Sequence, residues 1–218
     1  MATNPNLVGT YKNGGESISS SHSTRPKRVY AAGANGSRIH QLLASSSDAS
    51  DNTLLLYQLI QMTAQSAMGV GAHVDGGGGS DTITRTVGSF VTDGWKIGDF
   101  MFVHGSTTLA NDYIKRLTGV AATTLTFATA TVSAAENLPA GAVLYKATLL
   151  GTIALPANAG NSATIPAVDL LDPSIFPDLD DEPRRFRTLG ANNAIAVAVG
   201  SGLGASEFVD ISSAGGDY

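Results

Sequence analysis

Short apolar runs separated by turn-forming residues recur along most of this chain. Segments of strand length that are rich in Val, Ile, Leu, Thr, Tyr and Phe alternate with clusters of Gly, Asn, Asp, Ser and Pro from Arg28 to the C-terminus. Apolar runs of this length, with a period of two residues and frequent turns, are typical of sheets that pack face to face. The pattern therefore predicts an all-β protein.

The predicted strands fall into two groups that are separated along the chain. The outer group comprises 28–32, 37–44, 53–62, 148–155, 163–171, 193–199 and 208–212. The inner group comprises 82–86, 100–104, 113–120, 124–128 and 142–145. Residues 53–62 fit a buried strand and a short helix equally well, and we choose the strand because the surrounding pattern is β.

A run of four glycines, Gly76–Gly79, suggests a boundary, because consecutive glycines inside a strand carry a high entropic cost. We therefore expect a Gly-rich linker over 69–79 and a small β-barrel or sandwich over 80–145. This module is expected to be inserted in a loop of an outer β-sandwich, jelly-roll or immunoglobulin-like, built from 28–68 and 146–218. The outer strands are numerous enough to cover both faces of one core.

The first 27 residues are polar and rich in Gly and Ser, and they predict an extended N-terminal arm over 1–27. Two interpretations stay open: a disordered leader, or an arm that becomes ordered on a neighbouring subunit. In the second case, the apolar and basic side chains of this region and of the residue after it are the candidate partner-binding residues. They are Leu7, Val8, Tyr11, Arg25, Lys27 and Arg28.

The composition points to a weakly charged surface. Only 14% of the residues are charged, against about 25% in an average domain. Such a surface, rich in Ser, Thr, Asn and Gly, suits extended contact with neighbouring subunits, although a secreted β protein with a neutral surface is the alternative. A net charge of −5 gives no general attraction to nucleic acid, so we expect no nucleic-acid partner.

The beginning of the chain lacks the basic start and apolar core of a signal peptide, and no apolar run approaches the ~20 residues of a membrane span. We therefore expect a soluble protein that is made inside the cell and has no membrane partner. The absence of cysteine excludes disulfides and thiolate metal sites.

No arrangement of residues in the sequence matches a known catalytic pattern. A Gly-x-Ser-x-Gly pentapeptide is missing, and Gly76–Gly79 is not followed by the lysine of a phosphate-binding loop. A hydrolase that uses His73, His104 or Asp99 is the hypothesis we favour least. The low aromatic content, 6%, is thin for a protein that processes carbohydrate. We expect no catalytic residue, and hence a protein that is not an enzyme.

Two weak metal patterns are present. His73 and Asp75, with His104 or Asp99, have side chains that suit zinc or manganese. The carboxylates of 178–182 suit calcium, but the EF-hand spacing is absent and arginines follow directly. Chance matches and neutralisation on a loop explain these patterns better, so we expect no metal and no cofactor.

Three segments carry a resemblance to a known class of protein. Residues 7–15 (LVGTYKNGG), 31–39 (AAGANGSRI) and 149–160 (LLGTIALPANAG) resemble small β-sandwich proteins encoded in the structural gene clusters of tailed phages. Residues 81–99, with DGWKIGD near their end, look like a module that recurs in phage virion proteins.

The resemblance implies a structural virion protein. Its closest functional class is the capsid decoration, or cement, protein, which sits on the capsid surface, commonly as a homotrimer, and binds the major capsid protein. Such a protein is assembled into the virion in the host cytoplasm. The alternative is a tail, baseplate or fibre-associated adaptor whose inserted domain faces a receptor or a sugar.

Overall fold

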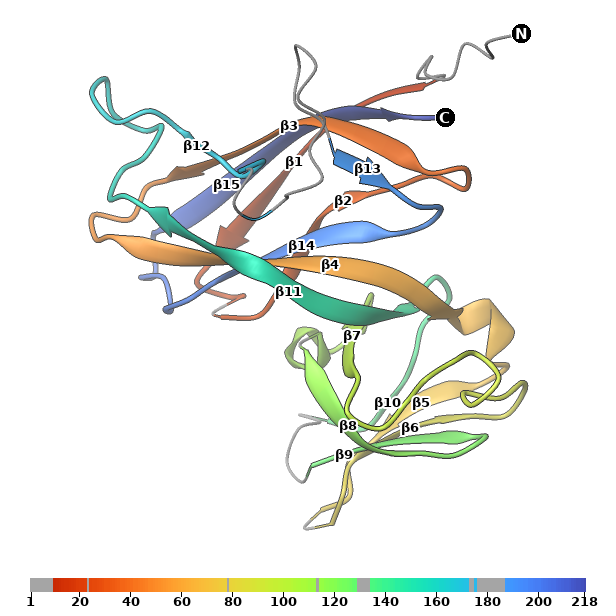
Figure 1. Cartoon of the computed structure of the whole chain (residues 1–218). Coiled ribbons are helices and arrows are strands. Elements are labelled where there is room, and N and C mark those ends of the chain that lie inside the picture. Colours follow the sequence, from red (N-terminus) through yellow and green to blue (C-terminus); the bar gives the residue numbers. More distant parts are fainter. Residues whose placement is uncertain are drawn as a thin grey trace, which may run out of the picture. The chain divides into compact units, whose positions relative to one another are not determined.

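The computed structural model describes residues 10–22, 24–77, 79–112, 114–128, 134–172, 175 and 187–218 (Figure 1). These residues form an almost entirely β protein with large antiparallel sheets, and the expected all-β sandwich is confirmed. Among them, helical structure is limited to two single turns, η1 (Gln65–Ala67) and η2 (Leu109–Asn111). The chain divides into two compact units, unit 1 (1–58 and 149–218) and unit 2 (59–148).

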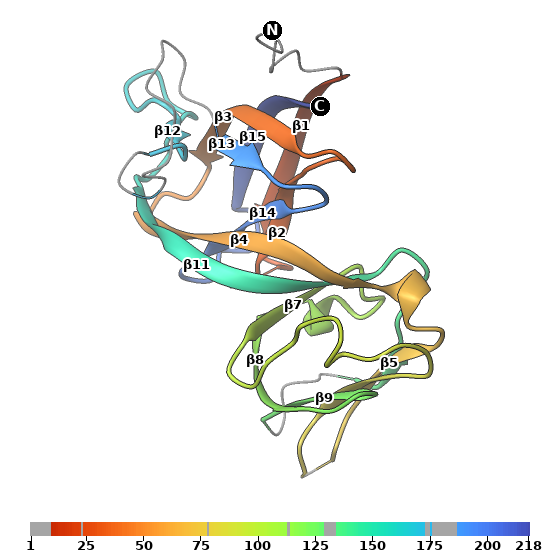
Figure 2. The same ribbon diagram turned by 45° about the vertical axis from the view of Figure 1, so that its right-hand side comes forward.

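Unit 1 contains two sheets that form separate layers in both views of the ribbon (Figures 1 and 2). The five-stranded sheet has the order β1-β15-β3-β12, with β13 also paired to β3. Its strands are β1 (Thr10–Ser19), β3 (Ser37–Ser46), β12 (Val168–Asp169), β13 (Arg187–Leu189) and β15 (Phe208–Asp217). The facing sheet has the order β11-β4-β14-β2. Its strands are β2 (Lys27–Ala31), β4 (Asn52–Ala64), β11 (Val143–Leu155) and β14 (Ala194–Val199).

The core of unit 1 lies between these two sheets. Alternate residues of β3 and β4, such as Ile39, Leu54 and Leu56, are fully buried there, as the period-two pattern predicts. All six residues of β14 are buried, and this strand is the longest purely apolar run of the chain. The opposite faces of β15 and β3 are polar, so the pattern of each strand fixes which face of the sheet meets the core.

Unit 2 has its own core and contains the other strands of the ten-stranded antiparallel sheet to which β11, β4, β14 and β2 belong. The order of this part of the sheet is β10-β5-β6-β9-β8-β7-β11. The strands are β5 (Gly71–Val74), β6 (Thr82–Arg85), β7 (Phe100–His104), β8 (Lys115–Val120), β9 (Thr124–Phe127) and β10 (Glu136–Asn137). Phe90, Trp95 and Phe127 are the largest side chains of its core. That this unit is an inserted barrel or sandwich module stays a prediction.

The predicted N-terminal arm is wrong for residues 10–19. These residues form β1, which pairs with β15 over its full length, from Thr10 opposite Asp217 to Ser19 opposite Phe208. Ile18 is the one residue of β1 that is completely buried. A single apolar anchor gives no visible period in the sequence, and the strand forms because β15 supplies a complete partner. Leu7 and Val8 lie outside the described residues.

The predicted linker over 69–79 is also wrong in part, because residues 71–74 form β5 and pair with both β6 and β10. Gly71 is buried here for a packing reason: a Cβ atom would lie 3.0 Å from the Met68 side chain and 3.3 Å from that of Leu138. The contacts divide the chain at Leu59 within β4 and at Thr148 within β11, rather than at the glycine run.

The remaining differences concern strand lengths. The predicted strands 142–145 and 148–155 form one continuous strand, β11. The predicted strand 163–171 shrinks to β12, because the Ser162 hydroxyl accepts hydrogen bonds from the amides of Thr164 and Ile165 and curls the chain. The ambiguous segment 53–62 is a strand, as predicted, and extends to Ala64.

Candidate functional site

The face of the five-stranded sheet that points away from the core is exposed to solvent along β1 and β15. Because β1 pairs with β15 without a register shift, alternate residues of the two strands share this face. On β1 they are Tyr11, Asn13, Gly15 and Ser17. Opposite them on β15 are Gly216, Ala214, Ser212 and Asp210. Between Tyr11 at one end and Phe208 at the other, the side chains of β1 and β15 on this face are small or polar.

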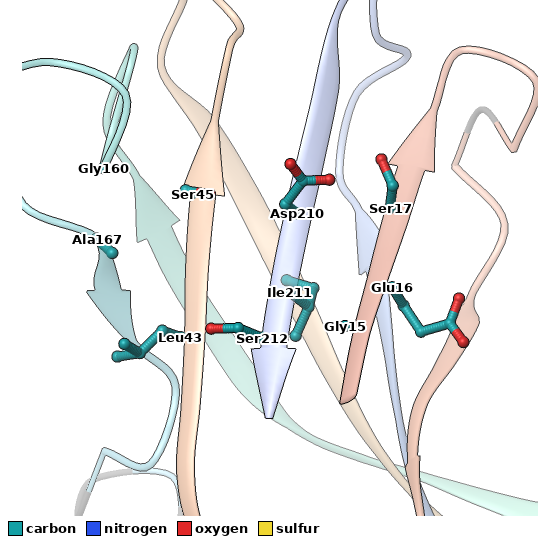
Figure 3. Close-up of a pocket in the computed structure, with 10 residues that line it drawn as sticks. All are labelled: Gly15, Glu16, Ser17, Leu43, Ser45, Gly160, Ala167, Asp210, Ile211 and Ser212. Carbon is teal, nitrogen blue, oxygen red and sulfur yellow. The ribbon is translucent and has the colours of Figure 1, made fainter. Parts of the chain in front are cut away.

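A shallow groove of about 440 Å³ crosses this face (Figure 3). Glu16, Ser17 and Gly15 of β1 lie on one side of it, and Asp210 and Ser212 of β15 lie between β1 and β3. The groove continues over Leu43 and Ser45 of β3, and Gly160 and Ala167 line its far side. The groove is therefore built from three neighbouring strands and from the connection between β11 and β12.

The groove is lined by hydroxyls, carboxylates and apolar side chains. It offers the hydroxyls of Ser17, Ser45 and Ser212, the carboxylate of Asp210 and the apolar side chain of Leu43. The second carboxylate, that of Glu16, is paired with Lys27 at 2.9 Å. None of the residues that line the groove is a histidine, lysine or cysteine, and its proton acceptors are the carboxylates of Asp210 and Glu16. The groove can supply hydrogen bonds to a polypeptide backbone and apolar contact through Leu43.

Tyr11 stands on the same face and is 81% exposed. Its cross-strand neighbour, Gly216, has no side chain, so the ring has no partner directly opposite it on β15. Tyrosine combines a large apolar ring with a hydrogen-bonding hydroxyl, and it is enriched at protein interfaces for that reason. Tyr11 is the candidate partner-binding residue that the structure leaves open to solvent.

The basic candidates have internal roles instead. Lys27 donates to the Ser17 carbonyl at 2.8 Å in addition to its pair with Glu16. Arg25 closes the turn after β1 by donating to the carbonyls of His22, at 3.0 Å, and Ser21. Arg28 lies half-buried on β2, opposite Ala196. Two of these charges, on Lys27 and Arg25, therefore hold β1 and its following turn in place.

A further ion pair anchors the other end of β1. Lys12 contacts the Asp217 carboxylate at 2.7 Å and also donates to the Ala31 carbonyl at 3.2 Å. Burial alone raises the pKa of Asp217, but hydrogen bonds from Lys12, Ser37 and the Gly33 amide outweigh it and hold the pKa of this carboxyl below its usual value. The groove face is thus built on a strand that is tied at both ends.

The residues considered for catalysis or metal binding are not gathered into one site. His73 is buried beside Ser106, at 3.3 Å, whereas Asp99 pairs with Lys146 at 2.7 Å. Asp75 accepts from the Gly77 amide, and His104 lies opposite Val143 in the sheet. Within the described ranges, no group of three or more His, Asp or Glu residues could hold a metal ion. The acidic stretch 178–182 lies outside those ranges.

No helix in the described part of the chain is long and apolar enough to cross a membrane. Comparison of this chain with protein-family models, with curated proteins and with solved structures finds no match.

Proposed function

We propose that this protein is a non-enzymatic structural subunit of a tailed-phage virion, which decorates the capsid by binding the major capsid protein. The observation that carries the proposal is the open outer face of the five-stranded sheet, with its groove over β1, β15 and β3 and the exposed ring of Tyr11. The resemblance of residues 7–15, 31–39 and 149–160 to phage β-sandwich proteins supports the choice of partner.

The physical argument for a protein partner rests on the shape and charge of this face. Gly15 and Ser212 leave room for a partner's backbone to approach the sheet closely, and the few charges of the groove keep the cost of removing water low. A stable interface buries about 1,200–2,000 Å² in total, so the groove forms its centre rather than its whole extent. A homotrimer on the capsid surface is part of the same proposal.

Filling the groove tests the proposal directly. Ser212 is exposed on β15, and an arginine there would project a large charged side chain over the groove. We expect Ser212→Arg to weaken co-sedimentation of the protein with undecorated capsids by at least about tenfold. The matched control is Thr152→Arg, which places the same side chain on an exposed position of β11 in the facing sheet. Equal binding of the two variants would reject the groove as the interface.

Tyr11 gives a second test that removes contact area instead of adding bulk. Buried tyrosines at interfaces commonly contribute 1–2 kcal/mol or more, so Tyr11→Ala should lower capsid affinity by about tenfold while leaving the melting temperature unchanged. Tyr11→Phe keeps the ring and should retain most of the affinity. Full capsid occupancy by Tyr11→Ala would show that this end of the face lies outside the interface.

The alternative is a tail, baseplate or fibre-associated adaptor, and one observation favours it. Unit 2 exposes several large apolar side chains, which are available to a receptor or a sugar. They are Val70, Val87, Val91, Ile97 and Phe100, each at least half exposed. The two proposals differ in copy number, since a capsid protein is present in amounts comparable to the coat protein and a tail adaptor in very few copies.

A further inference from the structure

Unit 2 contains a buried polar cluster that the proposed function does not use. His73, on β5, is 1% exposed. Its Nε2 lies 3.3 Å from the Ser106 hydroxyl, and its Nδ1 is buried with no hydrogen-bond partner among the described residues. A buried polar atom with no partner is uncommon in folded proteins and costs free energy, so this position calls for a physical explanation.

The core of unit 2 also contains a buried lysine whose charge acts on the neutral His73 ring. Lys115, on β8, is 2% exposed, donates to the Asn111 carbonyl at 3.3 Å and lies 5.9 Å from the centre of the Phe127 ring. Burial lowers the pKa of Lys115 to about 8, although the carboxylates of Asp112, Asp81 and Glu136 act in the opposite direction. The side chain therefore keeps its positive charge at neutral pH.

The carboxylates around His73 are bound to other groups. Glu136 is the residue opposite His73 in the pairing of β10 with β5, but its oxygens accept from the Thr108 amide and from the Asn111 side chain, both at 2.8 Å. Asp112 accepts from the amides of Ser106, at 3.0 Å, and Gly105, at 3.4 Å. These bonds use the carboxylates to hold the connection between β7 and β8.

The other residues around His73 are either apolar or are carboxylates that accept hydrogen bonds from the backbone. Its partner on β6 is the apolar Ile83. Asp81 accepts from the Gly76 amide at 2.9 Å, and the exposed Asp75 accepts from the Gly77 amide at 2.8 Å. Burial, and then the charge of Lys115, lower the pKa of His73 to about 4, and Glu136 opposes them only in part.

We propose that His73 is an acid-sensitive latch: while neutral it keeps unit 2 closed, and on protonation it releases the pairing of β5 with β10 and the connection between β7 and β8. The mechanism is electrostatic. A protonated ring would place a second positive charge near Lys115, and its Nδ1–H would point into a region without an acceptor. The ring can gain both hydration and distance from Lys115 only if these segments open. This inference does not depend on the proposed function.

The sign of the pH effect on the stability of the closed state follows from how many protons His73 binds in the closed and opened states. The opened state has a histidine with an ordinary pKa of 6.5, and the closed state has one with a pKa of about 4. Between these values the opened state binds more protons, so the closed state loses stability as the pH falls through this window. The closed-to-open ratio should fall by nearly tenfold per pH unit inside this window, and by about 300-fold in total from pH values well above it to pH values well below it.

The chain carries its own reporter for this transition. Trp95 is the only tryptophan, lies in the core of unit 2 and donates to the Thr63 hydroxyl at 3.1 Å. Its fluorescence therefore follows the opening of unit 2 in the full-length protein. Urea unfolding followed by Trp95 at about pH 7 and at about pH 4 measures the closed-to-open ratio at each value.

The decisive comparison uses His73→Gln, whose amide retains a polar atom near Ser106 and does not titrate. We expect most of the pH-dependent loss in stability to disappear in this variant. His40→Gln is the control, because His40 is exposed on β3 of unit 1, and it should behave as the unchanged protein does. If His73→Gln keeps the full pH dependence, the latch is disproved.

An NMR titration of the unchanged protein and the variant Lys115→Met test the role of His73 without the need for His73→Gln to fold. In the unchanged protein, NMR titration of the His73 ring should show no protonation above about pH 5, and protonation near pH 4 together with the change in Trp95. Titration near the ordinary value in a fold that stays closed would overturn the proposal. Lys115→Met, which removes the neighbouring charge, should make the acid-induced loss shallower, and an unchanged or steeper loss would count against it.

Discussion

At the scale of single residues, Arg85 organises the longest connection of unit 2. Its side chain is 2% exposed and makes four contacts at once. It pairs with Asp93 at 2.5 Å and donates to the carbonyls of Val87, at 2.5 Å, and Ala67, at 2.7 Å. The guanidinium also lies 4.7 Å from the centre of the Phe90 ring. The planar fork of arginine serves several acceptors in fixed directions, which a lysine cannot do.

Removal of this arginine should weaken unit 2 strongly. Arg85→Ala leaves the Val87 and Ala67 carbonyls without this donor and leaves Asp93, which is partly exposed, with the Thr63 hydroxyl alone, so we expect a loss of about 1–3 kcal/mol of unfolding free energy. Arg85→Lys should recover only a small part of this loss. The measurement is urea unfolding followed by Trp95, whose indole is linked to Asp93 through the Thr63 hydroxyl.

The matched control is Arg116→Ala, because Arg116 is exposed on β8 of the same unit. It should change the unfolding free energy by less than about 0.5 kcal/mol. If both variants lose the same amount, the stabilisation does not come from the buried contacts of Arg85.

At the scale of elements, β1 shows how a strand can form with almost no apolar pattern. Its order comes from ten consecutive pairs with β15, from the ion pairs at Lys12 and Glu16 and from one buried side chain, Ile18. The ion pairs are partly exposed, and such pairs contribute about 0–1 kcal/mol each. Most of the free energy that docks β1 against the core must therefore come from Ile18 and from the backbone pairing.

Truncation of Ile18 tests this account of β1. Ile18→Ala should lower the unfolding free energy of unit 1 by about 3 kcal/mol, because a buried isoleucine loses both its apolar contacts and the volume that it fills. Ser17→Ala, at the neighbouring position on the groove face, should have almost no effect. Hydrogen exchange of the β1 and β15 amides would report the change, and equal protection in the two variants would contradict it.

The same elements show what the sequence could and could not predict. The strands of unit 1 with alternating apolar residues, such as β3 and β4, were predictable, since burial on one face leaves a period of two. β1 was not, because a partner strand supplies its hydrogen bonds. The flexibility of glycine places Gly71 in a predicted linker. In the structure Gly71 lies in the core because it packs against Met68 and Leu138, and the sequence pattern does not indicate that these two residues are close to it.

The groove face was predictable only in one residue. Tyr11 was a candidate because of its ring, but Gly15, Ser17 and Ser212 carry no signal of function in the sequence. They become a surface only through the register of β1 with β15. The same holds for His73 and Ser106, which are separated by 33 residues and meet in the fold.

At the scale of the whole molecule, we propose that this chain binds other proteins. Its low charge content, the polar groove on its five-stranded sheet and its exposed Tyr11 are properties of the surface that support this proposal. The two units carry different features, a proposed binding face in unit 1 and a buried titratable cluster in unit 2, and each has its own variants and controls.

The most direct test of the central claim is the copy number of this protein in purified virions, measured by quantitative mass spectrometry against the major capsid protein. The account predicts a fixed ratio of the same order as the coat protein for the unchanged chain, and a marked loss of occupancy for Ser212→Arg but not for Thr152→Arg. A few copies per particle, or no copies at all, would contradict it.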